Sequence, residues 1–302
     1  MKQRIKGEIM NEVTGNISFE QNDLGWDGSQ MRCLLLTSMG RASLRDTLMQ
    51  VINQTKEYAN IKILDNFEYY PKGIVNPKEI ELDKQLIPID HSIKYCYELY
   101  KWWLGDTKKR ERTPVWDMAV TAEIDNTPGL ILIEAKAHEG ELNKEKKGKD
   151  KPSASRESMA NHERIGKAID EAREGLNRAS QSDKIKIDRD MCYQMSNRLA
   201  FAWKLARLGI PAVLIYLGFE NTTEMIDGRK NRLLKNYEQW KRTVNEHSKM
   251  IGFDLWEIPI TVEVENAKET VNIYPMIRSV DIKLEKGSLD TLLSVKRNGL
   301  GD

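Results

Sequence analysis

The sequence predicts an α/β fold, and three observations favour that class. Helical and strand-like patterns alternate through the middle of the chain in the order helix, strand, strand, helix, strand. The segment from Ala212 to Leu217 is apolar and rich in β-branched residues, which is typical of a strand buried on both faces of a sheet. A chain of 302 residues, of which 40% are hydrophobic and 31% charged, is long enough to bury a large core.

The domain organisation follows from what the chain lacks. No internal repeat and no linker rich in Gly, Ser or Pro divides it, so we expect a single domain over residues 1–302. Residues 90–220 carry the alternating pattern and are interpreted as one continuous core. Residues 1–89 and 221–302 are interpreted as extensions that flank this core.

The first extension carries short patterns. Met31 to Thr37 is an apolar run that predicts a strand. A helix is expected to begin near Ser43, a residue typical of helix caps, and to continue towards Tyr58. Ile61 to Leu64 predicts a second strand. None of these residues indicates a function.

The core begins with a helix and a hairpin. From Ser92 to Leu104, apolar residues recur at the helical period, and Gly105 is a suitable end for that helix. Two strands are then expected, from Val115 to Ile124 and from Leu130 to Ala137. The residues between them, Asp125 to Gly129, are mostly turn formers, so the two strands should pair as a hairpin.

The remaining elements are helices followed by strands. The predicted helices cover Ser158 to Ala179, Arg189 to Leu208 and Gly228 to Ser248, and the predicted late strands cover Ile258 to Val264 and Val271 to Ile273. The second of these helices ends at a Gly-Ile-Pro sequence, which is a strong stop signal. The strand from Ala212 comes directly after that stop.

Composition excludes several functional classes. The formal net charge is +1, so a polyanion could bind only to a local basic patch. The longest clean apolar run covers residues 210–219, whereas a membrane span needs roughly 20 residues. The first residues lack the apolar segment of a signal peptide, and the 3 cysteines are too far apart for a CxxC zinc site. We therefore expect a reduced, cytoplasmic protein that has no membrane partner.

Asn143 to Glu157 is the one stretch of low complexity, and its basic residues outnumber its acidic ones. Two interpretations remain open for this segment. It is either a solvated loop or a basic loop that closes on a phosphate backbone.

The second strand of the hairpin carries the residues that indicate chemistry. Glu134 and Lys136 follow an apolar run and, at the strand period of two, point to the same face. A turn centred between Asn126 and Thr127 pairs Asp117 with Lys136. Centring the turn one residue either way pairs Asp117 with Glu134 or with His138 instead. In each register Asp117 lies close to Glu134 and Lys136, because opposed Cβ atoms are about 4.5–5.5 Å apart.

Two carboxylates beside an ammonium are suited to metal-assisted phosphoryl chemistry. Carboxylate oxygens are the ligands that Mg²⁺ prefers, and a bound Mg²⁺ acidifies water and neutralises developing negative charge. A neighbouring lysine can orient the water and offset phosphate charge. The alternative interpretation is a structural ion-pair cluster without catalytic use.

The sequence Pro114-Val115-Trp116-Asp117, followed across the hairpin by Ile133-Glu134-Ala135-Lys136, resembles the PD-(D/E)xK nuclease superfamily. The resemblance covers roughly residues 90–220. It implies a restriction-endonuclease-like core, with a mixed central sheet flanked by helices. It also implies metal ligation by Asp117, Glu134 and the backbone carbonyl of Ala135, with Lys136 positioning the attacking water.

The same resemblance suggests supporting residues. Many members add an acid from the first helix, and Glu98 stands where that acid could be. A polar residue often stands on the helix after the motif, and Gln194 and Arg198 are the candidates there. His138 shares the face of Glu134 and could assist at the site. The ordinary alternatives are a solvated helix residue, two polar residues of an amphipathic helix, and a strand-end histidine in solvent.

We therefore expect a Mg²⁺-dependent nuclease, with Mn²⁺ as a substitute, that hydrolyses phosphodiester bonds in nucleic acid. DNA is the favoured substrate, in prokaryotic restriction or DNA processing. A homodimer would suit double-strand cutting, although no feature requires one. The alternatives are a catalytically inactive module that binds nucleic acid or protein within a larger prokaryotic complex, and a hydrolase of a small phosphorylated substrate.

Overall fold

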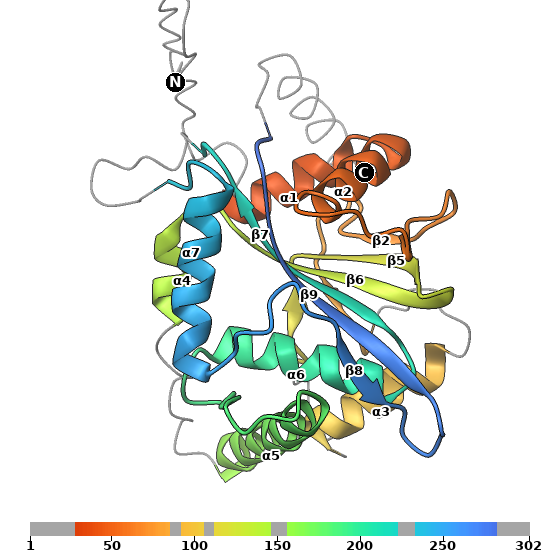
Figure 1. The fold of residues 1–302 in the computed structure, drawn as a ribbon, viewed down its shortest axis with the longest axis vertical. Coiled ribbons are helices and arrows are strands. Elements are labelled where there is room, and N and C mark those ends of the chain that lie inside the picture. Colours follow the sequence, from red (N-terminus) through yellow and green to blue (C-terminus); the bar gives the residue numbers. More distant parts are fainter. Residues whose placement is uncertain (1–27, 85–91, 106–111, 146–155, 223–232, 283–302) are drawn as a thin grey trace, which may run out of the picture.

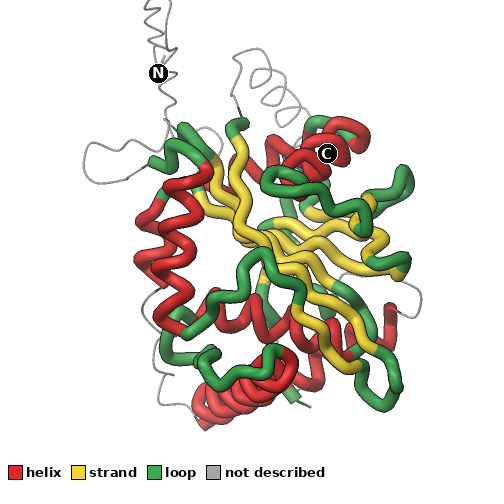
Figure 2. The backbone as a smooth tube through the Cα atoms, viewed as in Figure 1, coloured by secondary structure: helices red, strands yellow, loops and turns green. Residues whose placement is uncertain are grey.

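The computed structural model describes residues 28–84, 92–105, 112–145, 156–222 and 233–282. A twisted, mixed sheet of seven strands crosses the centre of this part of the chain, and helices lie on both of its faces (Figures 1 and 2). The predicted α/β class is confirmed. Within the described ranges no helix is long and apolar enough to cross a bilayer.

The sheet has the order β1-β5-β6-β7-β9-β8, and β2 pairs with β5 beyond this path. Its strands are β1 (Ile61–Lys62), β2 (Tyr69–Tyr70), β5 (Met118–Ile124), β6 (Thr127–Lys136), β7 (Ala212–Phe219), β8 (Ile260–Glu263) and β9 (Thr270–Val280). The pairs β6–β7 and β7–β9 are parallel, and the others are antiparallel. A separate two-stranded ladder joins β3 (Ile80–Glu81) to β4 (Val115–Trp116).

The helices divide between the two faces of the sheet. On one face lie α1 (Gly28–Ser38) and α2 (Arg41–Ile52), and on the other lie α3 (Ser92–Leu104), α5 (Arg156–Ala179) and α6 (Tyr193–Arg207). Beside these, α4 (Glu139–Glu145) packs against α7 (Tyr237–Ser248), as Figure 1 shows. A short 3₁₀ helix, Lys249–Ile251, follows α7.

The two central strands are buried on both faces because helices cover both. Along β6, Leu130 and Leu132 pack into the core beneath α5 and α6, whereas Ile131 and Ile133 pack into the core beneath α1 and α2. Every residue of β7 is buried, as predicted for the apolar segment that begins at Ala212. The continuous apolar pattern of a parallel strand is explained by this double cover.

Several predicted boundaries agree with the structure. The helix expected from Ser92 to Leu104 has those bounds, and the helices expected near Ser158 and Arg189 are α5 and α6. The predicted helix from Gly228 is α7, which begins at Tyr237. The side chain of Asn236 accepts a hydrogen bond from the Gln239 amide and so caps that helix. Residues 223–232, which include the predicted start, lie outside the described residues.

The strand predicted from Met31 to Thr37 is wrong, because these residues lie in α1. Residues 31–37 are all buried, since α1 packs against the sheet and also against the loop that carries Ile74. An unbroken apolar run has no period, so it cannot distinguish a buried helix from a buried strand. The Lys-rich segment is also revised at its start, where Asn143 belongs to α4, while residues 146–155 lie outside the described residues.

The hairpin turn is tighter than the sequence suggested. Asp125 and Asn126 both have positive φ, 52° and 60°, and these two residues alone connect β5 to β6. Two left-handed central residues match the twist of the paired strands. Ile124 therefore pairs with Thr127, and this shifts the register by one step from the central prediction to one of its two alternatives.

Candidate active site

The last residues of β6 place two charges in the interior. Glu134 and Lys136 continue the face of Leu132, so they point into the side of the sheet that α6 covers. Glu134 is 0% exposed and Lys136 is 5% exposed. A charge buried this deeply requires partners, because removing it from water is costly.

Asp117 comes from a break between two strands. The chain bends at this residue, so the single strand predicted from Val115 to Ile124 is divided into β4 and β5. Met118 pairs with Ile133, and one further step of that register sets Asp117 opposite Glu134. The Ala135 amide donates a hydrogen bond of 2.7 Å to Asp117 Oδ2, which holds the carboxylate against the end of β6.

Three donors surround the Glu134 carboxylate. Lys136 Nζ and Gln194 Nε2 both donate to Oε1, and Arg198 Nε donates to Oε2 over 2.6 Å. Gln194 and Arg198 are one turn apart on α6, which crosses this face of the sheet. The structure therefore brings five of the sequence-predicted residues together, namely Asp117, Glu134, Lys136, Gln194 and Arg198.

Arg198 is held on every side. Its Nη2 donates to the Val115 carbonyl over 2.6 Å, its Nη1 donates to Asn197 Oδ1 over 3.0 Å, and its guanidinium lies 4.4 Å from the centre of the Trp116 ring. The residue is 4% exposed. Arg198 therefore ties β4, β6 and α6 together and supports Glu134, and it is not placed to meet a substrate phosphate directly.

The two carboxyl groups have opposite acidities. Burial and the charge of Glu134 raise the pKa of Asp117 to about 8. Burial also opposes ionisation of Glu134, but Arg198 and Lys136 outweigh it and hold the pKa of Glu134 below its usual value. Glu134 therefore stays ionised, whereas the charge of Asp117 lacks a sufficient counter-charge.

Glu79 is a further acid at this site, and sequence reasoning missed it. Burial and the charge of Glu134 raise the pKa of Glu79, and Gln30 Nε2 donates to its Oε1 over 3.3 Å. The neighbouring Cys33 lies on α1, where burial and the charge of Asp117 raise the pKa of the thiol. The only sequence signal was the acid itself, because nothing local indicates that residues 30–79 fold beside the hairpin.

Glu98 and His138 stand apart from this cluster. Glu98 is partly buried on α3, which packs on α5 and α6, and no hydrogen bond or ion pair between described residues connects it to Asp117 or Glu134. His138 is 5% exposed and therefore not solvated, and its Nε2 lies 3.7 Å from Glu141 Oε1. Glu141 also accepts hydrogen bonds from the Ala137 amide and from Ser29, so His138 belongs to the junction of β6 with α4.

The donor set is suited to a hard divalent cation, although it is not a preformed cage. Arg198 influences the pKa of all three carboxyl groups, those of Glu79, Asp117 and Glu134, and Lys136 influences the pKa of Asp117 and Glu134. Among the described residues, no three His, Cys, Asp or Glu side chains are arranged as one ligand group. Asp117, Glu134 and the Ala135 carbonyl fit Mg²⁺ by their chemistry, since all supply oxygen.

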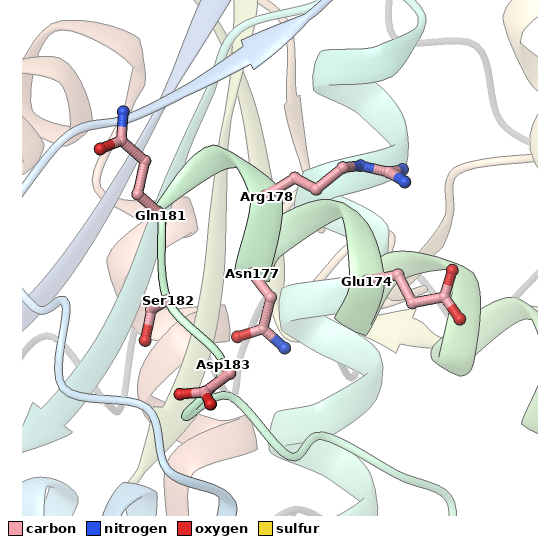
Figure 3. Close-up of a pocket in the computed structure, with 6 residues that line it drawn as sticks. All are labelled: Glu174, Asn177, Arg178, Gln181, Ser182 and Asp183. Atoms are coloured by element: carbon pink, nitrogen blue, oxygen red, sulfur yellow. The ribbon is translucent and has the colours of Figure 1, made fainter.

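A surface pocket lies away from this cluster. It is formed at the C-terminal end of α5 and in the loop that follows, and its lining is polar (Figure 3). Its residues are Glu174, Asn177, Arg178, Gln181, Ser182 and Asp183. Asn177 holds the backbone of Ile185, because its Nδ2 donates to the Ile185 carbonyl and its Oδ1 accepts from the Ile185 amide.

Comparisons with models of protein families, with curated proteins and with solved structures find no match to this chain. The function is therefore inferred from the residues and geometry of the cluster around Glu134.

Proposed function

We propose that this protein is a metal-dependent nuclease, which hydrolyses phosphodiester bonds in nucleic acid with Mg²⁺ or Mn²⁺ as the cofactor and DNA as the favoured substrate. The observation that carries the proposal is the convergence of Asp117, Glu134 and Lys136 at the junction of β5 and β6. The spacing predicted this convergence, and the hairpin register supports it.

The arrangement of the elements supports membership of the PD-(D/E)xK superfamily. The acids lie in a mixed sheet, at the end of a hairpin that follows α3 and precedes α6 and β7. This is the order expected of a restriction-endonuclease-like core. Along the chain, the first extension adds α1, α2 and three short strands before this core, and the second adds α7, β8 and β9 after it.

The residues divide the chemical work between them. Asp117, Glu134 and the Ala135 carbonyl would hold the cation, which when bound lowers the pKa of water and neutralises charge on the phosphate. The Lys136 ammonium is a hydrogen-bond donor and carries a positive charge. It would therefore orient the attacking water and offset phosphate charge. Arg198 and Gln194 keep Glu134 ionised and fixed in orientation.

A cleavage panel tests the proposal. Supercoiled plasmid, linear duplex and single strands are incubated with the protein in Mg²⁺ or Mn²⁺, with EDTA and the Asp117→Ala variant as controls. Cleavage that is lost in both controls is the expected result. An absence of cleavage, together with an unchanged melting temperature on adding either metal, would refute a metal-dependent nuclease, because a bound ion must stabilise the native state.

A second candidate is a catalytically inactive module that binds nucleic acid or a protein partner. The observation in its favour is that Glu134 already has three donors, as a purely structural carboxylate would. On this view the cluster holds β4, β6 and α6 together. Binding of nucleic acid that is equal in EDTA and in Mg²⁺, without cleavage, would favour this candidate.

A further inference from the structure

The edge of β5 that faces away from β6 carries two short strands. β1 pairs with the end of β5 near the hairpin turn, where Lys62 forms an ion pair with Glu123. β2 pairs with the start of β5, where Tyr70 faces Ala119. No described strand pairs with the other edge of β2. The sheet therefore has an open edge at the end of β5 that is nearer to Asp117.

Tyr70 lies on the face of the sheet that carries Glu134. It packs against the core cluster that contains its partner Ala119 and, on β6, Leu132, whose face Glu134 continues. Ala119 is two residues from Asp117, so the Cα atoms of these two residues are at most about 7 Å apart. The ring of Tyr70 is therefore close to the candidate site and on its side of the sheet.

Two cations lie over the aromatic rings of β2. Lys72 Nζ is 4.5 Å from the centre of the Tyr69 ring and 5.1 Å from the centre of the Tyr70 ring. The Arg41 guanidinium is 5.7 Å from the centre of the Tyr69 ring. Both cations share the carboxylate of Glu68, which is the only acid that forms an ion pair with either of them among the described residues. Two positive charges against one negative charge make this surface complementary to a phosphate.

The two tyrosines are accessible from solvent. Both are partly exposed, and their hydroxyls are neither buried nor hydrogen-bonded to any described residue. Unpaired nucleotides bind to such a combination of cations and rings, because their phosphates meet the charge and their bases stack on the aromatic face. Lys62 on β1 provides the contrast, since it is paired with Glu123 and contacts no ring among the described residues.

We propose that four side chains form a binding surface for single-stranded DNA beside the candidate site, namely Arg41, Tyr69, Tyr70 and Lys72. This inference rests on the proposed function, because it names the form of nucleic acid that reaches that site. Lys72 and Arg41 bind phosphates of the strand, and an unpaired base stacks on Tyr70. A duplex keeps its bases paired and stacked inside, so this surface binds single strands more tightly than duplex.

The test is the binding of a fluorescent single-stranded DNA oligonucleotide to the full chain in EDTA, measured by anisotropy. Tyr70→Leu keeps an apolar side chain against the core but removes the ring, so it should weaken binding about 10–100-fold. Tyr70→Phe keeps the ring and should bind within a few-fold of the unchanged protein. Lys72→Met should reduce the slope of log affinity against log salt concentration by about 0.7, as loss of one phosphate contact does on a single strand.

Lys62→Met is the matched control on the same edge of β5, and it should leave both the affinity and the salt dependence unchanged. Melting temperatures establish that each variant folds, and Lys72→Met tests the surface even if Tyr70→Leu does not fold. An equal loss of single-strand and duplex binding in Tyr70→Leu would overturn the assignment to unpaired bases.

The binding assay and the cleavage panel separate this inference from the proposed function. Unchanged single-strand binding in both Tyr70→Leu and Lys72→Met, or no binding by the unchanged protein, would overturn the inference even if the protein cleaves DNA in Mg²⁺. Binding that is weakened in both variants of a protein that cleaves no nucleic acid would support the inference and overturn the proposed reaction.

Discussion

Two buried arginines of this protein each bind a glutamate, and their surroundings differ. Arg198 binds Glu134 at the end of β6, and Arg278 binds Glu257 beside β9. Arg278 is 0% exposed and is also held by the carbonyls of Ile52 and Ile277. Both arginines therefore connect elements that are distant in sequence.

The pair of Glu257 and Arg278 is balanced. Arg278 donates to both oxygens of Glu257, and the Ile277 amide and the Tyr58 hydroxyl donate to the same carboxylate. Burial opposes the charge of Glu257, but Arg278 outweighs it and lowers the pKa. The single negative charge of Glu257 is paired with the single positive charge of Arg278, and both carboxylate oxygens accept hydrogen bonds.

The pair of Glu134 and Arg198 lies within a surplus of acid. Glu134 itself is satisfied, but Asp117 and Glu79 both have raised pKa values because they are buried near its charge. If the proposed function is right, this difference separates a structural ion pair, which neutralises itself, from a cation site, which keeps negative charge in excess at a cost to folding.

The largest expected effect concerns the lysine of the proposed site. Lys136→Ala should reduce nucleic-acid cleavage about 100–10,000-fold, because the water loses the group that orients it. The fold should survive, since Arg198 and Gln194 still bind Glu134. Cleavage rates and circular dichroism measure the two effects. Full activity in this variant would remove Lys136 from the mechanism.

The balanced pair should instead govern stability. Arg278→Met leaves Glu257 without its cation partner and should lower the free energy of unfolding by about 3–5 kcal/mol. Denaturant unfolding measures this change, and the exposed pair of Lys62 with Glu123 provides the control. Lys62→Met should change stability by less than about 1 kcal/mol. A comparable loss in both variants would contradict the importance of burial.

The surplus acid predicts a stabilising substitution. The pKa of Asp117 is raised from 3.8 to about 8, so its ionisation destabilises the fold progressively as the pH rises between these values. Asp117→Asn should therefore have little effect near pH 4 but stabilise the protein by about 1–3 kcal/mol at pH 8 in EDTA. Its amide oxygen can still accept from the Ala135 amide. Melting curves across this range test the sign, which a purely structural role for Asp117 would reverse.

The balanced pair should show the opposite dependence on pH. The folded-state pKa of Glu257 is lowered from 4.5, so its contribution to stability is complete above pH 4.5 and is lost as the pH falls below that value. Glu257→Gln should cost about 1–2 kcal/mol at pH 7, and the cost should shrink on acidification. A pH-independent cost would mean that shape, and not charge, is what Glu257 contributes.

Much of the core could be predicted because its signals are local. The bounds of α3 follow from an apolar stripe and a terminal glycine, and β7 follows from its apolar run between two stops. Strand parity alone set Glu134 and Lys136 on one face. The hairpin turn limited the position of Asp117 to a few registers, all of which lie near Glu134.

The flanks could not be predicted to the same degree. Residues 31–37 are surrounded by protein on all sides, so an apolar run that looked like a strand folds as a helix. Glu98 was predicted as a further acid of the site, whereas Glu79, whose pKa is raised by the charge of Glu134, gave no local signal. Glu79 directly precedes β3 and Asp117 directly follows β4, and each of these strands has two residues. Elements this short leave almost no periodic pattern in the sequence.

The sequence by itself determined the chemistry of β6, because alternation along one strand is a local property of neighbouring residues. It determined which charges share a face and which apolar residues face the core. Only the tertiary structure decided that Arg198 supports Glu134 and that Glu79 lies near enough for the charge of Glu134 to raise its pKa. Both decisions depend on contacts between segments far apart in the chain, where burial, and not local propensity, sets the outcome.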